Sequence, residues 1–288
     1  MEFTEQAAIA LPGDRLLKGA ALSPSGDVVA AWFAGSRGVR LYGESAPRDI
    51  LLAEIGHAVG VSFLNEDHME VVDAASGHVV RADATGAVDS RKALPGARQA
   101  TAAARIATGW VLAITGSDST PSHLRLPRGR GTWVPDSSHA GPLGLSGDGR
   151  RALVWQTLSP FRAWRSGTGP EWRPAEFEPV SADWFEHDIG SAPRRSPALW
   201  SVTSAVAVGP GHLQTWANRG TDDRLLLWFD GRGRFQRYVH VQVPFGFVAA
   251  AAKAPVMLAV RTLNGSELVK YSWEQVSGAT LQHKEATR

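Results

Sequence analysis

Two alternating series of turns divide this chain into six units of similar length, and that regularity constrains the fold more than any other feature of the sequence. The first series comprises Ser23 to Gly26, Asn65 to Asp67, Ala107 to Gly109, Ser146 to Gly149, Gly209 to Gly211 and Lys253 to Pro255. The second follows half a period later and comprises Glu44 to Pro47, Asp83 to Gly86, Arg128 to Gly131, Ser166 to Gly169, Asp230 to Gly233 and Val276 to Gly278. A period of about 40 residues with short strands between turns is typical of radial β-repeats, in which each unit buries its faces against its neighbours.

The stretch from Leu17 to Glu54 shows how one unit is built. Its four β-rich segments are Leu17 to Leu22, Val28 to Phe33, Val39 to Tyr42 and Ile50 to Glu54, each bounded by a turn. The sequence therefore predicts an all-β fold, a six-bladed β-propeller of four-stranded antiparallel blades. The first segment of each unit is rich in small residues, which suits a crowded central channel. We expect the following residues near the axis: Ala20, Gly60, Ala103, Gly144, Ala205 and Ala249.

Two of the first-series turns resemble a known repeat. Leu22-Ser23-Pro24-Ser25-Gly26 and Leu145-Ser146-Gly147-Asp148-Gly149 are similar to the Leu-Ser-Pro-Asp-Gly turn of WD40-like and TolB-like β-propellers. That resemblance implies the architecture, with the turn between the first and second strands of a blade. It implies no chemistry, because propellers include enzymes, lectins and scaffolds. The Trp-Asp dipeptide of true WD40 repeats does not occur.

Length and composition limit the number of domains and the classes of function that this chain can have. The 288 residues exceed an average domain, but six blades and one insertion account for nearly all of them, so we expect a single domain over residues 1–288. Thirty Lys and Arg against 28 Asp and Glu give a formal charge of +2, which is no nucleic-acid signature. There is no Cys, so disulfides and thiolate chemistry are excluded.

Residues 1–10 lack the features of a signal peptide, and no apolar stretch is long enough to span a membrane. We expect a cytoplasmic protein that binds neither nucleic acid nor membrane.

The chain ends leave two questions open. Phe3 to Leu11 is predicted either to complete the sixth blade as its outer strand or to form a loose tail. The spacing is also compatible with an incomplete seventh blade.

One insertion breaks the repeat. From the turn at Ser146 to the turn at Gly209 the chain is about half a unit longer than the period of about 40 residues allows, so extra residues lie at about 174–200, between blades four and five. Long loops on a rigid scaffold often carry binding residues. We therefore predict a partner site here. Its residues are Trp184, Phe185, Glu186, His187, Asp188, Arg194, Arg195 and Trp200.

The roles within this predicted site differ. Trp184 and Phe185 offer an amphipathic anchor, and the paired arginines Arg194 and Arg195 suit a carboxylate or phosphate. Trp155, Trp164 and Trp172 fall on predicted strands and are expected in the core, whereas Trp184 and Trp200 are predicted to be free for a partner. The alternative interpretation of the insertion is a solvated loop. Likewise, Asn65 to His68 is predicted to be a solvated turn on the opposite face.

Propeller geometry also predicts which loops share a face. Loops that connect one blade to the next lie beside loops between second and third strands. The predicted face displays Ser36, Arg37, His57, Asp73, Ser117, Asp118, Asp136, His139, Asn218, Asp222, Asp223 and Asn264 as well as the insertion.

Two functions are compatible with this sequence. The leading interpretation is a non-enzymatic scaffold that presents this face to a protein or peptide, with no cofactor. The alternative is a metal-dependent hydrolase or lactonase with a cation near the channel. Six-bladed lactonases hold such a metal with Glu, Asn and Asp residues, and the available set here is Asn218, Asn264, Asp118 and Asp188. The sequence shows no motif of a serine hydrolase, nucleotidase or zinc protease.

Overall fold

Nearly all the regular structure is β-strand. The computed structural model describes residues 2–13, 15–43, 47–117, 120–127, 132–133, 143–147, 152–156, 163–166, 172–174, 200–218, 220–231, 235–262 and 266–274. Within these ranges the strands form six antiparallel sheets of four, and one short 3₁₀ helix, η1 (Ala97–Gln99), precedes the third sheet. The predicted fold class is confirmed. None of the helical structure in these ranges is long and apolar enough to cross a bilayer.

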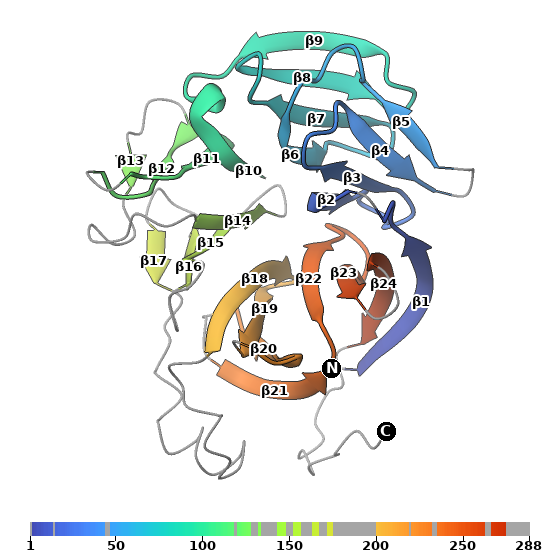
Figure 1. Cartoon of the computed structure of the whole chain (residues 1–288), viewed down its shortest axis with the longest axis vertical. Helices are drawn as coiled ribbons and strands as arrows, with labels where there is room; N and C mark the ends of the chain where they lie inside the picture. Colours follow the sequence, from blue (N-terminus) through green and yellow to red (C-terminus); the bar gives the residue numbers. More distant parts are fainter. Residues whose placement is uncertain are drawn as a thin grey trace.

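The sheets surround a central axis as the blades of a propeller (Figure 1). The innermost strands of blades 1 to 6 are β2 (Leu17–Leu22), β6 (Ala58–Phe63), β10 (Ala100–Ile106), β14 (Leu143–Gly147), β18 (Trp200–Val208) and β22 (Phe245–Ala250). The second strands are β3 (Val29–Phe33), β7 (His68–Asp73), β11 (Gly109–Ile114), β15 (Ala152–Gln156), β19 (Gly211–Asn218) and β23 (Val256–Thr262). Each innermost strand contacts the innermost strands of both neighbouring blades, so the ring is closed.

The outer half of each blade is more variable in length. The third strands are β4 (Val39–Tyr42), β8 (His78–Asp83), β12 (His123–Arg125), β16 (Ala163–Ser166), β20 (Asp223–Phe229) and β24 (Ser266–Glu274). The outermost strands are β5 (Arg48–Ile50), β9 (Val88–Ala93), β13 (Thr132–Trp133), β17 (Trp172–Pro174) and β21 (Phe235–Gln242), with β1 (Glu2–Ala10) in blade 6.

The N-terminal strand closes the ring. β1 pairs antiparallel with β24, and beyond it the amide of Leu11 donates to the carbonyl of Ser266 at 3.0 Å. Arg261 of β23 reinforces the pairing because its guanidinium contacts both Glu5 of β1 and Glu267 of β24. The prediction that Phe3 to Leu11 completes the sixth blade is confirmed. The first and last strands of the sequence are therefore held in one sheet.

Six hydrophobic clusters occupy the six boundaries between adjacent blades. Strand β3 shows why: Ala30 and Trp32 pack toward blade 2, whereas Val29, Ala31 and Phe33 pack toward blade 6. Because side chains alternate along a strand, a sheet that is covered on both faces needs apolar residues at every position. The core is thus a ring of interfaces.

Small residues on the innermost strands allow the blades to meet closely. A Cβ on Gly60 would lie 2.4 Å from the carbonyl oxygen of Ala103 in the next blade. A Cβ on Gly144 would lie 2.0 Å from the indole of Trp155, which packs behind it. These contacts explain the small first segments seen in the sequence, since a larger side chain would collide with the next blade at Gly60 and with the second strand of the same blade at Gly144.

Polar contacts join blades 1 to 3 on the face that carries the first-series turns. Glu66 in blade 2 accepts hydrogen bonds at 2.9 Å from the amide and the hydroxyl of Ser25 in blade 1. Glu70 accepts from Arg105 Nε and Trp110 Nε1 of blade 3, both at 3.0 Å. Carboxylates of blade 2 therefore link it to both of its neighbours.

Candidate functional site

The candidate site is the mouth of the central channel together with the loops around it. These loops connect the outermost strand of one blade to the innermost strand of the next, or the second strand to the third. We call this surface the loop face. Its described segments are residues 11–13, 15–16, 34–38, 51–57, 74–77, 94–99, 115–117, 120–122, 220–222 and 243–244.

The channel holds a cavity of about 450 Å³ that is lined by the innermost strands of all six blades. Its walls are mainly Ala, Gly and Val, and they include Ala20, Ala103, Gly144, Ala205 and Ala249. The predicted ring of small residues near the axis is thereby confirmed at these five positions. Gly60, the sixth, lies in the same ring of strands and packs against Ala103.

Charge in this cavity has one sign. Among the described residues that line it, none is Asp or Glu, and the basic side chains are Lys18, His57 and Arg105. Arg105 is neutralised because its Nε lies 3.0 Å from Glu70, a residue outside the lining. Within the described ranges no carboxylate forms an ion pair with Lys18. Lys18 thus contributes a positive charge that the cavity itself does not neutralise.

A bulge recurs in five innermost strands, at the second residue of β2, β6 and β10 and at the fourth residue of β18 and β22. The register with the second strand shifts at Lys18, Val59, Thr101, Thr203 and Val248. All five residues line the cavity, whereas β14 pairs with β15 without a shift. Bulges re-aim side chains and occur at barrel rims and beside functional sites. We call these five cavity-lining residues the bulge ring.

The same kind of hydrogen bond, from a threonine hydroxyl to a carbonyl of the second strand, occurs at two of the bulges. Thr101 Oγ1 donates to the carbonyl of Ala113 at 3.3 Å, and Thr203 Oγ1 donates to the carbonyl of Thr215 at 3.1 Å. Each hydroxyl provides a hydrogen bond to a second-strand carbonyl beside the register shift. Buried backbone carbonyls are almost always hydrogen-bonded. Thr101 Oγ1 also lies 3.2 Å from the hydroxyl of Thr115.

Asp73 is a structural residue of the loop face and not a displayed one, which corrects its predicted role. Its side chain is 1% exposed, and its carboxylate accepts hydrogen bonds from the amides of His57, Ala75 and Ser76 at 2.7 to 3.1 Å. Burial alone raises the pKa of Asp73, but the hydrogen bonds from Ser76, His57 and Ala75 outweigh it, so the pKa lies below the usual value. Asp73 therefore stays ionised and ties the 51–57 connection to the 74–77 loop.

The residues considered for a metal do not form a site in the part of the chain that the structure describes. Asn218 is the described member of that set, and it is buried at the end of β19 and does not line the channel cavity. Among the described residues, no three His, Asp or Glu side chains are close enough to share a metal ion. The remaining members of the set, and two further residues of the predicted face, lie outside the described ranges: Asp118, Asp188, Asn264, Asp136 and His139.

Blade 5 contains a buried polar chain away from the channel. Gln214 lies 3.1 Å from the imidazole of His212 and accepts a hydrogen bond from Trp216 Nε1 at 3.0 Å. His212 also stacks on Phe229 with the ring centroids 4.6 Å apart. None of these side chains lines the cavity. Their contacts satisfy one another inside the blade, which is the behaviour expected of structural polar groups.

The insertion between blades 4 and 5 lies outside the described residues, and with it Trp184, Phe185, Glu186, His187, Asp188, Arg194 and Arg195. Trp200 is described, and its predicted freedom to contact a partner is wrong. It is the first residue of β18, is 1% exposed, and packs with Leu153 and Trp155 between blades 4 and 5. Trp155 is in the core, as predicted.

Exposed apolar side chains gather on the loop face of blade 1. Leu16 is 67% exposed and Leu52 is 48% exposed. Both adjoin the 34–38 loop, because the carbonyl of Leu16 accepts from the amide of Ala34 at 2.8 Å and a Cβ on Gly38 would lie 2.9 Å from Leu52 Cδ2. Arg37 is exposed in the same loop. We call Leu16, Arg37 and Leu52 the blade 1 patch.

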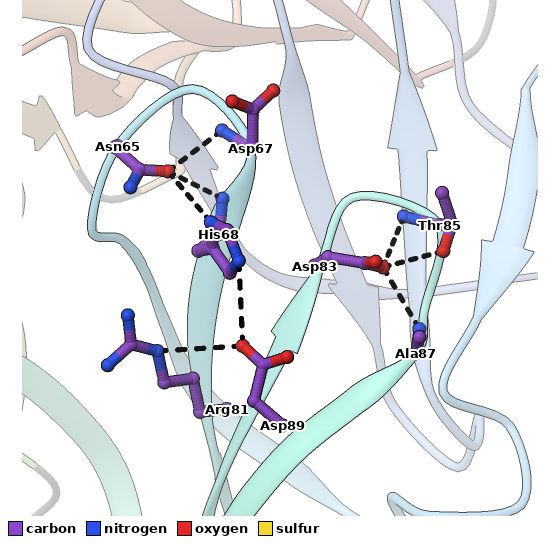
Figure 2. A network of polar contacts seen from close by, with 8 residues as sticks. All are labelled: Asn65, Asp67, His68, Arg81, Asp83, Thr85, Ala87 and Asp89. Atoms are coloured by element: carbon purple, nitrogen blue, oxygen red, sulfur yellow. Dashed lines mark hydrogen bonds and ion pairs between the residues drawn. The ribbon is translucent and has the colours of Figure 1, made fainter.

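On the opposite face, polar groups of the turn at Asn65 are hydrogen-bonded within that turn. Figure 2 shows Asn65, whose side-chain oxygen accepts from the amides of Asp67 and His68 at 2.9 and 2.8 Å. Asp89 lies 3.6 Å from His68 and 3.7 Å from Arg81. Asn65 and Asp67 are exposed. The prediction of a solvated turn is confirmed, and its polar groups stabilise blade 2.

Sequence reasoning missed Lys18, Thr101 and Thr203. A signal was present, because an apolar residue, a variable residue and a small residue occur in the same order at each bulge. The five examples are Leu17-Lys18-Gly19, Ala58-Val59-Gly60, Ala100-Thr101-Ala102, Val202-Thr203-Ser204 and Phe247-Val248-Ala249. The variable residue in each lies at the register shift and lines the cavity.

Solved structures share this architecture. A luciferin-regenerating enzyme aligns with a TM-score of 0.56 at 8% identity, covering 93% of this chain and 95% of that chain. A catalytically inactive virginiamycin B lyase from Staphylococcus aureus, solved with quinupristin, aligns with a TM-score of 0.53 at 11% identity, covering 95% and 100%. The propeller domain of the Trilobed protease from Pyrococcus furiosus gives 0.53 at 13% identity, covering 90% and 82%.

These similarities show the fold alone, because every identity is far below the level at which function is shared. The Pyrococcus domain is described as having an open velcro topology, whereas β1 and β24 pair in this chain. No protein-family model and no curated protein matches the sequence.

Proposed function

We propose that this β-propeller is a non-enzymatic, cytoplasmic scaffold that presents its loop face to a protein or peptide partner. The observation that carries the proposal is the blade 1 patch, where two leucines are exposed beside an arginine. Isolated exposed leucines are ordinary. Two that adjoin one loop, with an exposed arginine in that loop, are suited to a partner segment that is apolar and acidic.

Backbone strain at Leu51 supports the proposal. Leu51 has a φ of 58°, and it is the one non-glycine residue with a positive φ in the described ranges. Its carbonyl accepts from the amides of Glu54 and Ile55, which forms a tight turn that keeps Leu51 buried and leaves Leu52 exposed. Such a conformation costs about 1–3 kcal/mol and persists where the surroundings enforce it, often at binding sites. The exposure of Leu52 follows from that turn.

Charge favours an acidic partner. Arg15 and Arg37 are both exposed on the loop face of blade 1. Glu54, the acidic residue of the neighbouring connection, forms an ion pair with Arg91 of blade 2. The patch therefore retains an excess of positive charge, which steers an acidic segment toward it.

The insertion supplies a second contact in this proposal. Its flanking residues Pro174 and Trp200 end β17 and begin β18, and the connection between two blades belongs to the loop face. Blade 1 lies across the ring from blades 4 and 5 (Figure 1). A partner that contacts both would cover the channel mouth, with Trp184 as an apolar anchor and Arg195 as a bidentate donor to a carboxylate.

The test measures affinity for a purified partner. Proteins that are retained by the wild-type chain are identified and purified, and their binding is then measured by calorimetry. We expect the Leu16→Asp, Leu52→Asp double variant to bind at least tenfold more weakly, and Trp184→Ala with Arg195→Ala to do the same. Val88→Asp is the matched control, because Val88 is an exposed apolar residue on the outermost strand β9. Equal affinity for all of these variants would overturn the proposal.

A second measurement addresses the metal-dependent alternative. Protein that is purified without chelators is analysed for bound divalent metal and for hydrolysis of esters and lactones. A stoichiometric metal together with turnover would replace the scaffold with an enzyme.

A further inference from the structure

We propose that the mouth of the central channel binds a small organic carboxylate with an apolar body. The ligand proposed here is a small molecule, and it would contact different residues from the partner proposed for the loop face. It rests on the shape, the charge and the bulges of the channel.

The cavity has the size and lining of a small-molecule site. Its volume of about 450 Å³ falls within the range of about 300–1,000 Å³ that is usual for ligand pockets. Val59, Val61, Phe63, Phe247 and Val248 contribute apolar surface to it. Such walls accommodate a hydrocarbon or aromatic body and leave orientation to a few polar groups.

The charge of the lining selects an anion. The described lining contains no carboxylate, and Arg105 is already paired with Glu70. Lys18 supplies the remaining full positive charge at the mouth, and His57 lines the same cavity. A cationic ligand would meet Lys18 without an acidic partner in the described lining. A carboxylate would gain an ion pair without displacing one.

The bulge ring explains how Lys18 comes to serve the mouth. In a regular strand, side chains alternate between the two faces of the blade, which here are packed against the neighbouring blades. The register shift between Leu17 and Gly19 releases Lys18 from that alternation. Among the described lining residues, Lys18 is the cation without an acidic partner, and His57 lines the same cavity, so Lys18 is the charged donor for a carboxylate.

The experiment compares three probes of matched shape by calorimetry: 4-phenylbutyrate, 4-phenylbutanol and 4-phenylbutylamine. We expect 4-phenylbutyrate to bind most tightly and to weaken as salt is added, because salt screens an ion pair at a solvent-exposed lysine. Equal binding of the alcohol would overturn the proposal, as would the absence of measurable binding of 4-phenylbutyrate.

Variants locate the site. Lys18→Met should weaken 4-phenylbutyrate about fivefold, which corresponds to about 1 kcal/mol for a partly exposed ion pair, and Lys18→Arg should restore most of it. Lys92→Met is the control, because Lys92 is exposed on the outermost strand β9. Thr101→Glu should weaken the anion and favour 4-phenylbutylamine, whereas Thr101→Ser should resemble the wild type. Circular dichroism checks the fold of each variant. Unchanged affinity in Lys18→Met would place the anion elsewhere and refute the inference.

Discussion

Replacing Gly60 by alanine tests the close contact between innermost strands on which the ring depends. The new Cβ would lie 2.4 Å from the carbonyl oxygen of Ala103 and 2.8 Å from its Cβ. Both atoms belong to β10, the innermost strand of the next blade. A flexible side chain could rotate away, but a strand in a closed ring can move only with its blade.

The expected loss of stability follows from that geometry. Overpacking a well-filled core typically costs about 1–3 kcal/mol, and the backbone obstruction here favours the upper end, about 3 kcal/mol. An unfolding entropy of roughly 2.1 cal/mol/K per residue, applied to the 288 residues, gives about 0.6 kcal/mol/K. The melting temperature of Gly60→Ala should therefore fall by about 5 °C.

The assay is urea unfolding at 25 °C together with calorimetric melting. Gly13→Ala is the control, because a Cβ on Gly13 would have no neighbour within 4 Å, and we expect it within about 0.5 kcal/mol of the wild type. If Gly60→Ala matched the Gly13→Ala control, blades 2 and 3 would not be in the close contact described, and the small first segments would need another explanation.

Three further substitutions or deletions test other parts of the fold. Deleting residues 1–11 removes β1 and exposes the edge of β24, so stability should fall by several kcal/mol; an unchanged melting temperature would refute ring closure. Asp73→Ala leaves three amides unpaired and should cost about 3 kcal/mol at pH 7 in urea unfolding. Because the folded-state pKa of Asp73 is lowered, its contribution is present above the unfolded-state value of about 3.9 and is lost as pH falls through the folded value, so the difference between variant and wild type should shrink in acid. Trp200→Ala should cost about 3–5 kcal/mol by leaving a cavity between blades, whereas a loss of partner binding without destabilisation would restore its predicted surface role.

The sequence predicted the fold well because turns and strand periodicity are local features. The turn at Ser23 to Gly26 and its counterparts recur wherever a first strand meets a second, so six units could be predicted without any knowledge of packing, with an incomplete seventh blade left open. Closure by Phe3 to Leu11 was predictable only as an alternative, because its partner strand, β24, lies at the other end of the chain. Pairing over such a separation leaves no local pattern.

Predictions about side chains were weaker because they depend on contacts between blades. Asp73 was expected on the displayed face because it lies where a second strand passes to a third, but three amides from two loops enclose it. Trp200 adjoins a polar insertion in sequence, yet it begins β18 and packs between two blades. The apolar, variable and small residues at each bulge recur in the sequence, but that pattern acquires a meaning only from the strand pairing, which shows the register shift at Lys18.

The bulge ring also explains how a six-fold architecture can recognise a ligand that has no symmetry. Five innermost strands carry a bulge, but only the one in blade 1 carries a formal charge, on Lys18. A cation on one side of an apolar mouth matches a molecule with its charge at one end. The blade 1 patch lies outside that mouth and uses different residues. Lys18→Met should therefore abolish the preference for 4-phenylbutyrate and leave the partner bound, whereas Leu16→Asp with Leu52→Asp should release the partner and leave 4-phenylbutyrate binding unchanged. Loss of both activities in either variant would mean that the two proposed sites are one.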